Sequence, residues 1–150
     1  MREILFRGQT RRYGEKIKMN GEKVKSNWVY GGIFPQNKGG DFAIIYQQES
    51  TIKKYPVYAD TVGQYTGMLD KNGKKIFEGD IVRNKNKYFQ FVGIVKYQNG
   101  QFMVDWKLHQ RVSNGVISST VTHHLGNADE VIGNIYDNPE LVEGEENDKL

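Results

Sequence analysis

Residues 60–82 decide the fold, and they read Asp60-Thr-Val-Gly-Gln-Tyr-Thr-Gly-Met-Leu-Asp-Lys-Asn-Gly-Lys-Lys-Ile-Phe-Glu-Gly-Asp-Ile-Val82. Residues 70–73, Asp-Lys-Asn-Gly, are typical of a hairpin loop in which Gly73 takes the left-handed conformation. Residues 78–80, Glu-Gly-Asp, predict a second turn, because an aspartate beside a glycine can accept hydrogen bonds from nearby backbone N–H groups. The expected core aromatics of this stretch are Tyr65 and Phe77.

The dipeptide Asn-Gly recurs outside this stretch as well. It occurs four times, at residues 20–21, 72–73, 99–100 and 114–115. Both residues tolerate the positive φ angles that a two-residue hairpin turn requires. The repetition predicts a protein built from antiparallel hairpins.

The turn at residues 99–100 also predicts a register. It places Val95 opposite Val104 and Gly93 opposite Trp106, so that the apolar residues of both strands share one face of the sheet. By the same reasoning, residues 114–115 would place Val112 opposite Ile117 and Leu108 opposite Val121. Residues 20–21 would place Ile17 opposite Val24.

Other strands are expected where apolar residues are concentrated between turn signals, at residues 3–7, 27–34, 42–46, 80–83 and 131–136. Residues 48–60 are expected to carry at most a short helical turn. Helix should be scarce, because no stretch keeps apolar residues at helical spacing for three turns. Residues 35–41, Pro-Gln-Asn-Lys-Gly-Gly-Asp, have the composition of a loop.

Composition indicates an ordinary globular protein. Of the 150 residues, 37% are hydrophobic and 26% are charged. The sequence contains no cysteine, which excludes disulfides and thiolate metal sites. The first seven residues lack the run of about seven apolar residues that a secretory signal needs, and no window approaches the roughly 18 of a membrane span. We therefore expect a cytoplasmic protein with no membrane partner.

Charge is distributed unevenly along the chain. Residues 137–150 contain six acidic residues and one basic residue, which leaves +8 on residues 1–136 for a net charge of +3. A basic body can attract nucleic acid. The alternative is that lysines keep the edges of β-sheets soluble and unpaired.

Residues that could carry chemistry are few. The histidines are His109, His123 and His124. Neighbouring residues of a strand point to opposite faces, so the adjacent pair is unsuited to binding one metal ion. Glu78 and Asp80 could be paired carboxylates, but turn geometry explains them better. No phosphate loop, nucleophile elbow or dinucleotide motif occurs. We expect neither catalysis nor a cofactor.

Basic residues next to aromatic ones are the remaining candidates. Such a combination can hold phosphates while stacking bases. A lysine-rich, solubilising hairpin loop is the alternative. The candidate polyanion-binding residues are Arg83, Lys85, Lys87, Tyr88, Lys53 and Lys54.

Residues 61–82 resemble the signature of the YopX family, which consists of small proteins from phages and prophages of Gram-positive bacteria. Three other segments agree in order along the chain: Phe6-Arg7, residues 28–32 (Trp-Val-Tyr-Gly-Gly) and residues 130–141. The main departure is Met68-Leu69, where a pair such as Leu-Lys is expected. The resemblance implies a mostly β fold and a mobile-element origin. It implies no activity, so no catalytic residues are carried over from it.

We therefore expect an all-β or mainly β protein of antiparallel hairpins. Its predicted parts are an N-terminal β lobe (residues 1–58), an SH3-like partial barrel (59–141) and an acidic flexible tail (142–150). The expected function is that of a phage-derived accessory protein that binds an unidentified host or phage macromolecule. The alternatives are a nucleic-acid-binding module with a basic β surface and a structural homo-oligomer.

Overall fold

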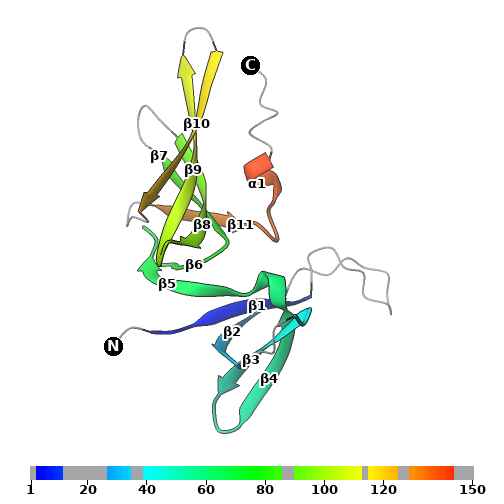
Figure 1. The fold of residues 1–150 in the computed structure, drawn as a ribbon. Coiled ribbons are helices and arrows are strands. Elements are labelled where there is room, and N and C mark those ends of the chain that lie inside the picture. Colours follow the sequence, from blue (N-terminus) through cyan, green and yellow to red (C-terminus); the bar gives the residue numbers. More distant parts are fainter. Residues whose placement is uncertain are drawn as a thin grey trace. The chain divides into compact units, whose positions relative to one another are not determined.

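The computed structural model describes residues 3–11, 27–34, 39–85, 90–112, 115–124 and 129–143 (Figure 1). Antiparallel strands dominate these residues, so the expected mainly β class is confirmed. The chain divides into two compact units, which we call unit 1 (residues 1–67) and unit 2 (residues 68–150). The chain passes from one unit to the other within a single strand, β5.

Unit 1 contains five strands and a 3-10 turn among its described residues. They are β1 (Phe6–Arg11), β2 (Asn27–Ile33), β3 (Phe42–Gln48), β4 (Ile52–Tyr58), η1 (Ala59–Thr61) and the first part of β5 (Gly63–Leu69). The strands follow one another in the sheet as β4-β3-β2-β1-β5, and neighbouring strands pair antiparallel.

The core of unit 1 forms around Ala43, Ile45 and Val57, each at most 3% exposed. The side chains packed against these three are Phe6, Val29, Ala59 and Val62. Strand β1 reaches β4 across this core, since a Cβ on Gly8 would lie only 2.7 Å from Cγ2 of Val57. A glycine at this position therefore allows the backbone of β1 to approach the core closely.

Residues 48–60 differ from the sequence expectation, which allowed them at most a helical turn. Residues 52–58 form strand β4, and only residues 59–61 form a helical turn. The alternation typical of a strand is hidden here by the lysines and by Pro56. Proline is tolerated because β4 is the outer strand of the sheet, the position to which prolines in sheets are normally confined.

Residues 59–62 belong structurally to unit 1. Ala59 and Val62 pack against its core. The Thr61 hydroxyl accepts a hydrogen bond from the Gln9 N–H (2.9 Å) and donates one to the Tyr58 carbonyl (2.7 Å). The division between the units therefore falls between Gly67 and Met68, whereas the sequence expectation placed it between 58 and 59.

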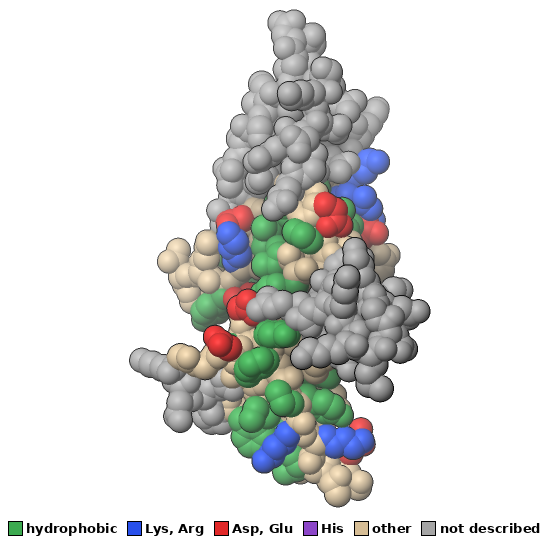
Figure 2. Space-filling model, turned by 90° about the vertical axis from the view of Figure 1, so that its right-hand side faces the viewer, with side chains coloured by type: hydrophobic (Ala, Val, Ile, Leu, Met, Phe, Trp, Pro, Cys, Tyr) green, Lys and Arg blue, Asp and Glu red, His purple; other side chains and the backbone are tan. Residues whose placement is uncertain are grey.

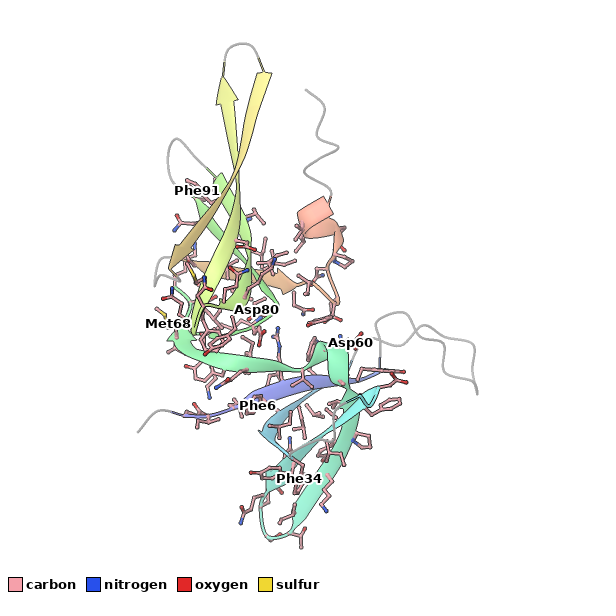
Figure 3. All side chains as sticks on the ribbon, viewed as in Figure 1. Phe6, Phe34, Asp60, Met68, Asp80 and Phe91 are labelled. Carbon is pink, nitrogen blue, oxygen red and sulfur yellow. The ribbon has the colours of Figure 1, made fainter. Side chains whose placement is uncertain are left out.

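Unit 2 contains β6 (Lys75–Phe77), β7 (Asp80–Lys85), β8 (Gln90–Gln98), β9 (Gln101–Val112), β10 (Gly115–His124), β11 (Glu130–Asn134) and the short helix α1 (Glu140–Glu143). Its sheet has the strand order β10-β9-β8-β7-β11. Strand β6 is the neighbour of β5. The buried core is formed by Ile76, Val82, Val95 and Val104, and Met68, Phe91 and Val131 pack against it. Figure 3 labels Met68, Asp80 and Phe91 in this unit.

The predicted hairpin at residues 99–100 is confirmed in every pair. Val95 lies opposite Val104, and Gly93 lies opposite Trp106. Asn99 and Gly100 both have positive φ angles, of 52° and 79°, as a two-residue turn of this kind requires. The strands are in register because the turn type and the apolar alternation specify the same pairing.

The predicted register of the next hairpin is wrong by two residues. Val112 pairs with Gly115 rather than Ile117, and Val121 pairs with Trp106 rather than Leu108. A shift of two residues returns every side chain to the same face of the sheet. The apolar alternation therefore could not distinguish the two registers, and the Asn-Gly turn preference selected the wrong one.

Several other expectations concern residues outside the described ranges. They include the hairpin at residues 20–21, most of the loop at residues 35–41 and most of the tail at residues 142–150. Among the described residues, no helix is long and apolar enough to cross a membrane. The SH3-like character expected of residues 59–141 remains a prediction.

Candidate functional site

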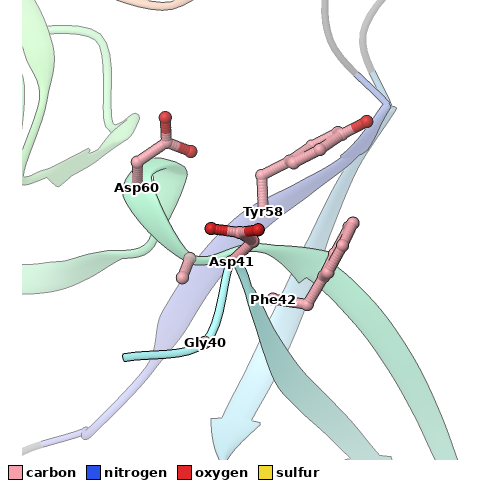
Figure 4. Close-up of a pocket in the computed structure, with 6 residues that line it drawn as sticks. Gly40, Asp41, Phe42, Tyr58 and Asp60 are labelled. Atoms are coloured by element: carbon pink, nitrogen blue, oxygen red, sulfur yellow. The ribbon is translucent and has the colours of Figure 1, made fainter. Parts of the chain in front are cut away.

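A hollow with a volume of about 400 Å³ lies in unit 1, where β3 begins and β4 ends. It is lined by Gly40, Asp41, Phe42, Tyr58, Ala59 and Asp60 (Figure 4). Phe42 and Tyr58 are direct partners in the antiparallel pairing of β3 and β4. Their rings therefore lie side by side, with centroids 5.1 Å apart and planes inclined at 32°. Phe42 is 54% exposed, so part of this aromatic surface faces solvent.

Two carboxyl groups accompany the aromatic pair. Asp41 immediately precedes Phe42, and Asp60 lies in η1. The carbonyl of Asp41 accepts a hydrogen bond from the Ala59 N–H (2.9 Å), which ties the start of β3 to the start of η1. Among the lining residues that the structure describes, none is basic. Aromatic faces beside carboxylates favour a cationic group, which the ring quadrupole and the acidic oxygens both attract.

Hydrogen bonds hold the backbone beneath the hollow. Thr61 is fully buried and bonds to both the Tyr58 carbonyl and the backbone of β1 at Gln9. The N–H of Val62 donates to the Ala59 carbonyl (3.3 Å). These bonds hold the segment from Tyr58 to Asp60 in place without using the side chains that line the hollow. The backbone that carries Tyr58, Ala59 and Asp60 is therefore fixed by bonds within unit 1.

The basic candidates of unit 1 lie on the outer strand β4. Lys53 is 3.8 Å from the Glu49 carboxylate, and both side chains are more than half exposed. The Lys54 ammonium lies 5.0 Å from the centre of the Phe34 ring. Figure 2 shows lysine and arginine side chains beside hydrophobic ones in the part of the chain that the structure describes. Each of these two lysines thus has a contact within its own unit.

The basic candidates of unit 2 lie on β7. The Arg83 guanidinium donates a hydrogen bond to the Glu130 carboxylate (2.9 Å), which is also 3.5 Å from the Lys71 ammonium. Lys85 is exposed at the end of β7. Lys87 and Tyr88 lie outside the described residues. Of the four described candidates, Lys53 and Lys54 belong to unit 1, and Arg83 and Lys85 belong to unit 2.

The turn interpretation of residues 78–80 is supported by the geometry. Gly79 has a φ angle of 88°, and the Asp80 carboxylate accepts a hydrogen bond from the Phe77 N–H (2.8 Å). Asp80 is 1% exposed. Its carboxylate thus stabilises the turn between β6 and β7.

The histidines occupy positions on β9 (His109) and at the end of β10 (His123 and His124). Their side chains are not among those described. Within the described residues, no group of three or more acidic or histidine side chains is arranged to hold a metal ion.

The Asp70 side chain accepts three backbone hydrogen bonds that connect the loop to β11. The sequence had identified Asp70 only as a loop residue. One carboxylate oxygen accepts hydrogen bonds from the N–H groups of Asn72 and Lys74 (both 2.8 Å). The other accepts from the N–H of Val131 in β11 (3.0 Å). The Lys71 N–H donates to the Asp129 carbonyl (2.9 Å), next to the same strand. The loop at residues 70–74 therefore anchors β11.

These contacts set the acid–base properties of the region. Burial raises the pKa of the Asp70 carboxyl, but the hydrogen bonds from Val131, Lys74 and Asn72 and the charge of Lys74 together bring the pKa below its ordinary value of 3.8. The hydrogen bond from Arg83 lowers the pKa of Glu130, which the charge of Lys71 lowers further.

These pKa shifts predict a loss of stability in acid. A depressed folded-state pKa means that ionised Asp70 stabilises the fold above the unfolded pKa, and that this stabilisation is lost as the pH falls through the folded-state pKa. We expect the free energy of unfolding to fall more steeply below about pH 4 in the wild type than in Asp70→Asn. Urea unfolding between about pH 7 and about pH 2.5 measures both slopes. Equal slopes would show that Asp70 does not contribute.

The sequence did not predict the hollow. Its residues fall at the borders of segments that were interpreted separately, namely a loop ending at Asp41 and a stretch at 48–60 that was not expected to be a strand. The signal that could have revealed it is the sequence Tyr55-Pro-Val-Tyr58, which has strand propensity despite its proline. Pairing that strand with residues 42–48 brings the two rings together.

Comparison with known proteins gives a family and a similar solved structure. The crystal structure of protein EF1440 from Enterococcus faecalis is similar, with 22% sequence identity, a TM-score of 0.45, and coverage of 95% of this chain and 99% of that one. The curated proteins contain no significant match to this sequence. Residues 12–143 match the family described as YopX protein, which is most of the chain. This protein therefore belongs to the YopX family.

Proposed function

We propose that this protein is a phage-derived accessory protein of the host cytoplasm that acts by binding another protein, not by catalysis. The observation that carries the proposal is the hollow of unit 1, where an exposed aromatic pair lies beside two carboxyl groups. The proposed partner presents a lysine or arginine side chain, because a cation is attracted by both features. The proposed phage origin is supported by membership of the YopX family, for which the resemblance implies a mobile-element origin.

The chemistry of the described carboxylates also supports binding over catalysis. Asp80 and Asp70 are buried, and both accept backbone hydrogen bonds that hold turns in place. Such carboxylates are committed to structure. The Glu130 carboxylate likewise accepts a hydrogen bond from Arg83 within the fold. In the hollow, by contrast, Phe42 is 54% exposed and presents part of its ring to solvent.

Nucleic acid is less well supported as a partner. Arg83 is bonded to Glu130, and Lys53 lies near Glu49. An arginine or lysine already beside a carboxylate gains less from a phosphate.

The proposal is tested by measuring peptide binding by fluorescence anisotropy. The probe is a labelled arginine-containing peptide of about ten residues, and the matched control peptide has glutamine in place of arginine. We expect the arginine peptide to bind the full chain, and Asp41→Asn to weaken its binding about fivefold or more, as the loss of a charge near a bound cation should. Phe42→Leu should weaken it similarly, because leucine keeps the apolar contact but removes the ring face.

Two controls make the outcome interpretable. Glu49→Gln removes one negative charge from an exposed position of unit 1 outside the hollow, so it should leave affinity unchanged within about twofold. A labelled DNA oligonucleotide is titrated in parallel. If the DNA binds with a steep salt dependence while the two peptides bind equally weakly, the protein-binding proposal is wrong and nucleic acid replaces it.

A further inference from the structure

Strand β10 (Gly115–His124) is the outermost strand of the sheet of unit 2, whose order is β10-β9-β8-β7-β11. Its inner side pairs with β9 along all ten residues. Within the described part of the chain, no strand pairs with its outer side. An outer strand presents a row of backbone N–H and C=O groups that can pair with another strand.

The sequence of β10 lacks the usual protection of an outer strand. It reads Gly-Val-Ile-Ser-Ser-Thr-Val-Thr-His-His and contains no proline, lysine, arginine, aspartate or glutamate. Half of its residues are β-branched, which favours the extended conformation. Proteins normally block such edges with charges, prolines, bulges or short length. None of these is present in β10.

The other outer strands of the two sheets are β4, β6 and β11, and each is protected. Strand β6 is only three residues long and begins with Lys75. Strand β4 of unit 1 carries Pro56 together with the exposed Lys53 and Lys54. Strand β11 of unit 2 is only five residues long, and its register shifts between Val131 and Gly133. Of the outer strands described, β10 is therefore the one that lacks features preventing it from pairing with a strand of another molecule.

At its turn end, the β9–β10 hairpin consists of two strands only among the described residues, because β8 does not extend so far. The last pair between β8 and β9 is Gln90 with His109, whereas the pairs of β9 with β10 continue to Val112 and Gly115. Figure 1 shows this hairpin extending beyond the neighbouring strands of unit 2. A two-stranded ribbon is only marginally stable in water, and additional strands stabilise it.

We propose that β10 pairs antiparallel with β10 of a second copy of this chain, around a two-fold axis near Ser119 and Thr120. A second copy fits because its only unprotected outer strand among those described is again β10. Pairing of like with like closes the assembly as a dimer, whereas pairing β10 with a different edge would form open chains. The strand carries no formal charge with neutral histidines, so two copies do not repel each other.

The test compares the mass of the full chain with that of a variant carrying charges on β10. In Val116→Glu/Thr120→Glu, each new carboxylate lies opposite a basic residue of β9 in the same chain, Arg111 and Lys107. These cross-strand pairs maintain the hairpin. The charges of two copies would, however, repel each other across the proposed interface. The variant is therefore directed at pairing between copies and not at folding.

Analytical ultracentrifugation over about 1–500 μM measures the result. We expect a dimer for the wild type, and a dissociation constant raised about tenfold or more in the double variant. Circular dichroism confirms that the variant is folded. If it is not folded, the single variant Thr120→Glu is measured in its place. The matched control Thr51→Glu adds the same charge at the exposed turn between β3 and β4, and it should leave the wild-type mass unchanged.

Three outcomes would overturn the proposal. A wild type that is monomeric over the whole concentration range has no such interface. A dimer that the charges on β10 do not weaken is formed by another surface. A mass above two chains is inconsistent with a closed two-fold pair.

Discussion

Asp70→Ala is expected to destabilise the protein by at least about 3 kcal/mol. The side chain is 6% exposed and accepts hydrogen bonds from the N–H groups of Asn72, Lys74 and Val131. Alanine would leave these donors without their acceptor, and an unsatisfied buried N–H costs more than the net value of the bond that is lost. The effect is measured as the free energy of unfolding in urea at neutral pH.

A graded pair of variants separates the hydrogen bonds from general disruption. Asp70→Asn keeps one acceptor oxygen at nearly the same volume, so its loss should be smaller than that of the alanine variant. Glu49→Ala removes an exposed carboxylate 3.8 Å from Lys53, and its effect should stay within about 0.5 kcal/mol. If Asp70→Ala were as mild as Glu49→Ala, Asp70 would not be the anchor of β11.

Gly31→Ala is expected to destabilise unit 1 by about 3 kcal/mol. A Cβ at Gly31 would lie 2.1 Å from the carbonyl oxygen of Tyr46 and 3.1 Å from Cγ2 of Ile45. The nearest atom belongs to the backbone of the neighbouring strand and cannot rotate away. Relief of the overlap requires β2 and β3 to separate, which would weaken the pairs Gly32–Tyr46 and Ile33–Ile45.

Gly40→Ala is the matched control in the same unit. The nearest atom to a Cβ at Gly40 is the Phe42 carbonyl oxygen at 3.5 Å, an ordinary contact distance. Its effect should remain below about 1 kcal/mol. Thermal unfolding of the two variants side by side distinguishes crowding between strands from a general effect of adding a methyl group. Equal melting temperatures would contradict the crowding.

The Gly31-Gly32 pair illustrates what the sequence could and could not predict. Its presence contributed to the family resemblance, but its physical role required the partner strand. A Cβ at Gly32 would lie 2.3 Å from Cζ of Tyr46, so the two glycines accommodate the backbone and the ring of the same tyrosine. That contact joins residues from different strands, and no local pattern shows it.

The two hairpins also show which registers can be predicted from the sequence. The register at residues 99–100 was predictable because turn type and apolar alternation both favoured a single pairing. At residues 114–115 the alternation allowed two pairings, and the prediction chose the wrong one. Strand β4 was missed because Pro56 contradicts a central strand, and its position at the edge is a property of the whole sheet.

The candidate site was less predictable than the fold. The sequence drew attention to basic residues, which the structure divides between two units and in part places beside carboxylates. The aromatic and acidic hollow depends on the pairing of Phe42 with Tyr58 and on the bond between Asp41 and Ala59. Both are contacts between segments well separated in sequence, so they appear only once the strands are paired.

The central claim is that the hollow of unit 1 recognises a cationic side chain, and NMR titration of the full chain with N-acetyl-arginine amide tests it most directly. We expect the ring resonances of Phe42 and Tyr58 to shift in a saturable manner with a dissociation constant of roughly 1–10 mM, as befits one cation–π contact with nearby carboxylates. The uncharged N-acetyl-glutamine amide should shift them far less, and Asp41→Asn should weaken the arginine response. Equal shifts with both ligands, or no saturable shift with either, would contradict the claim.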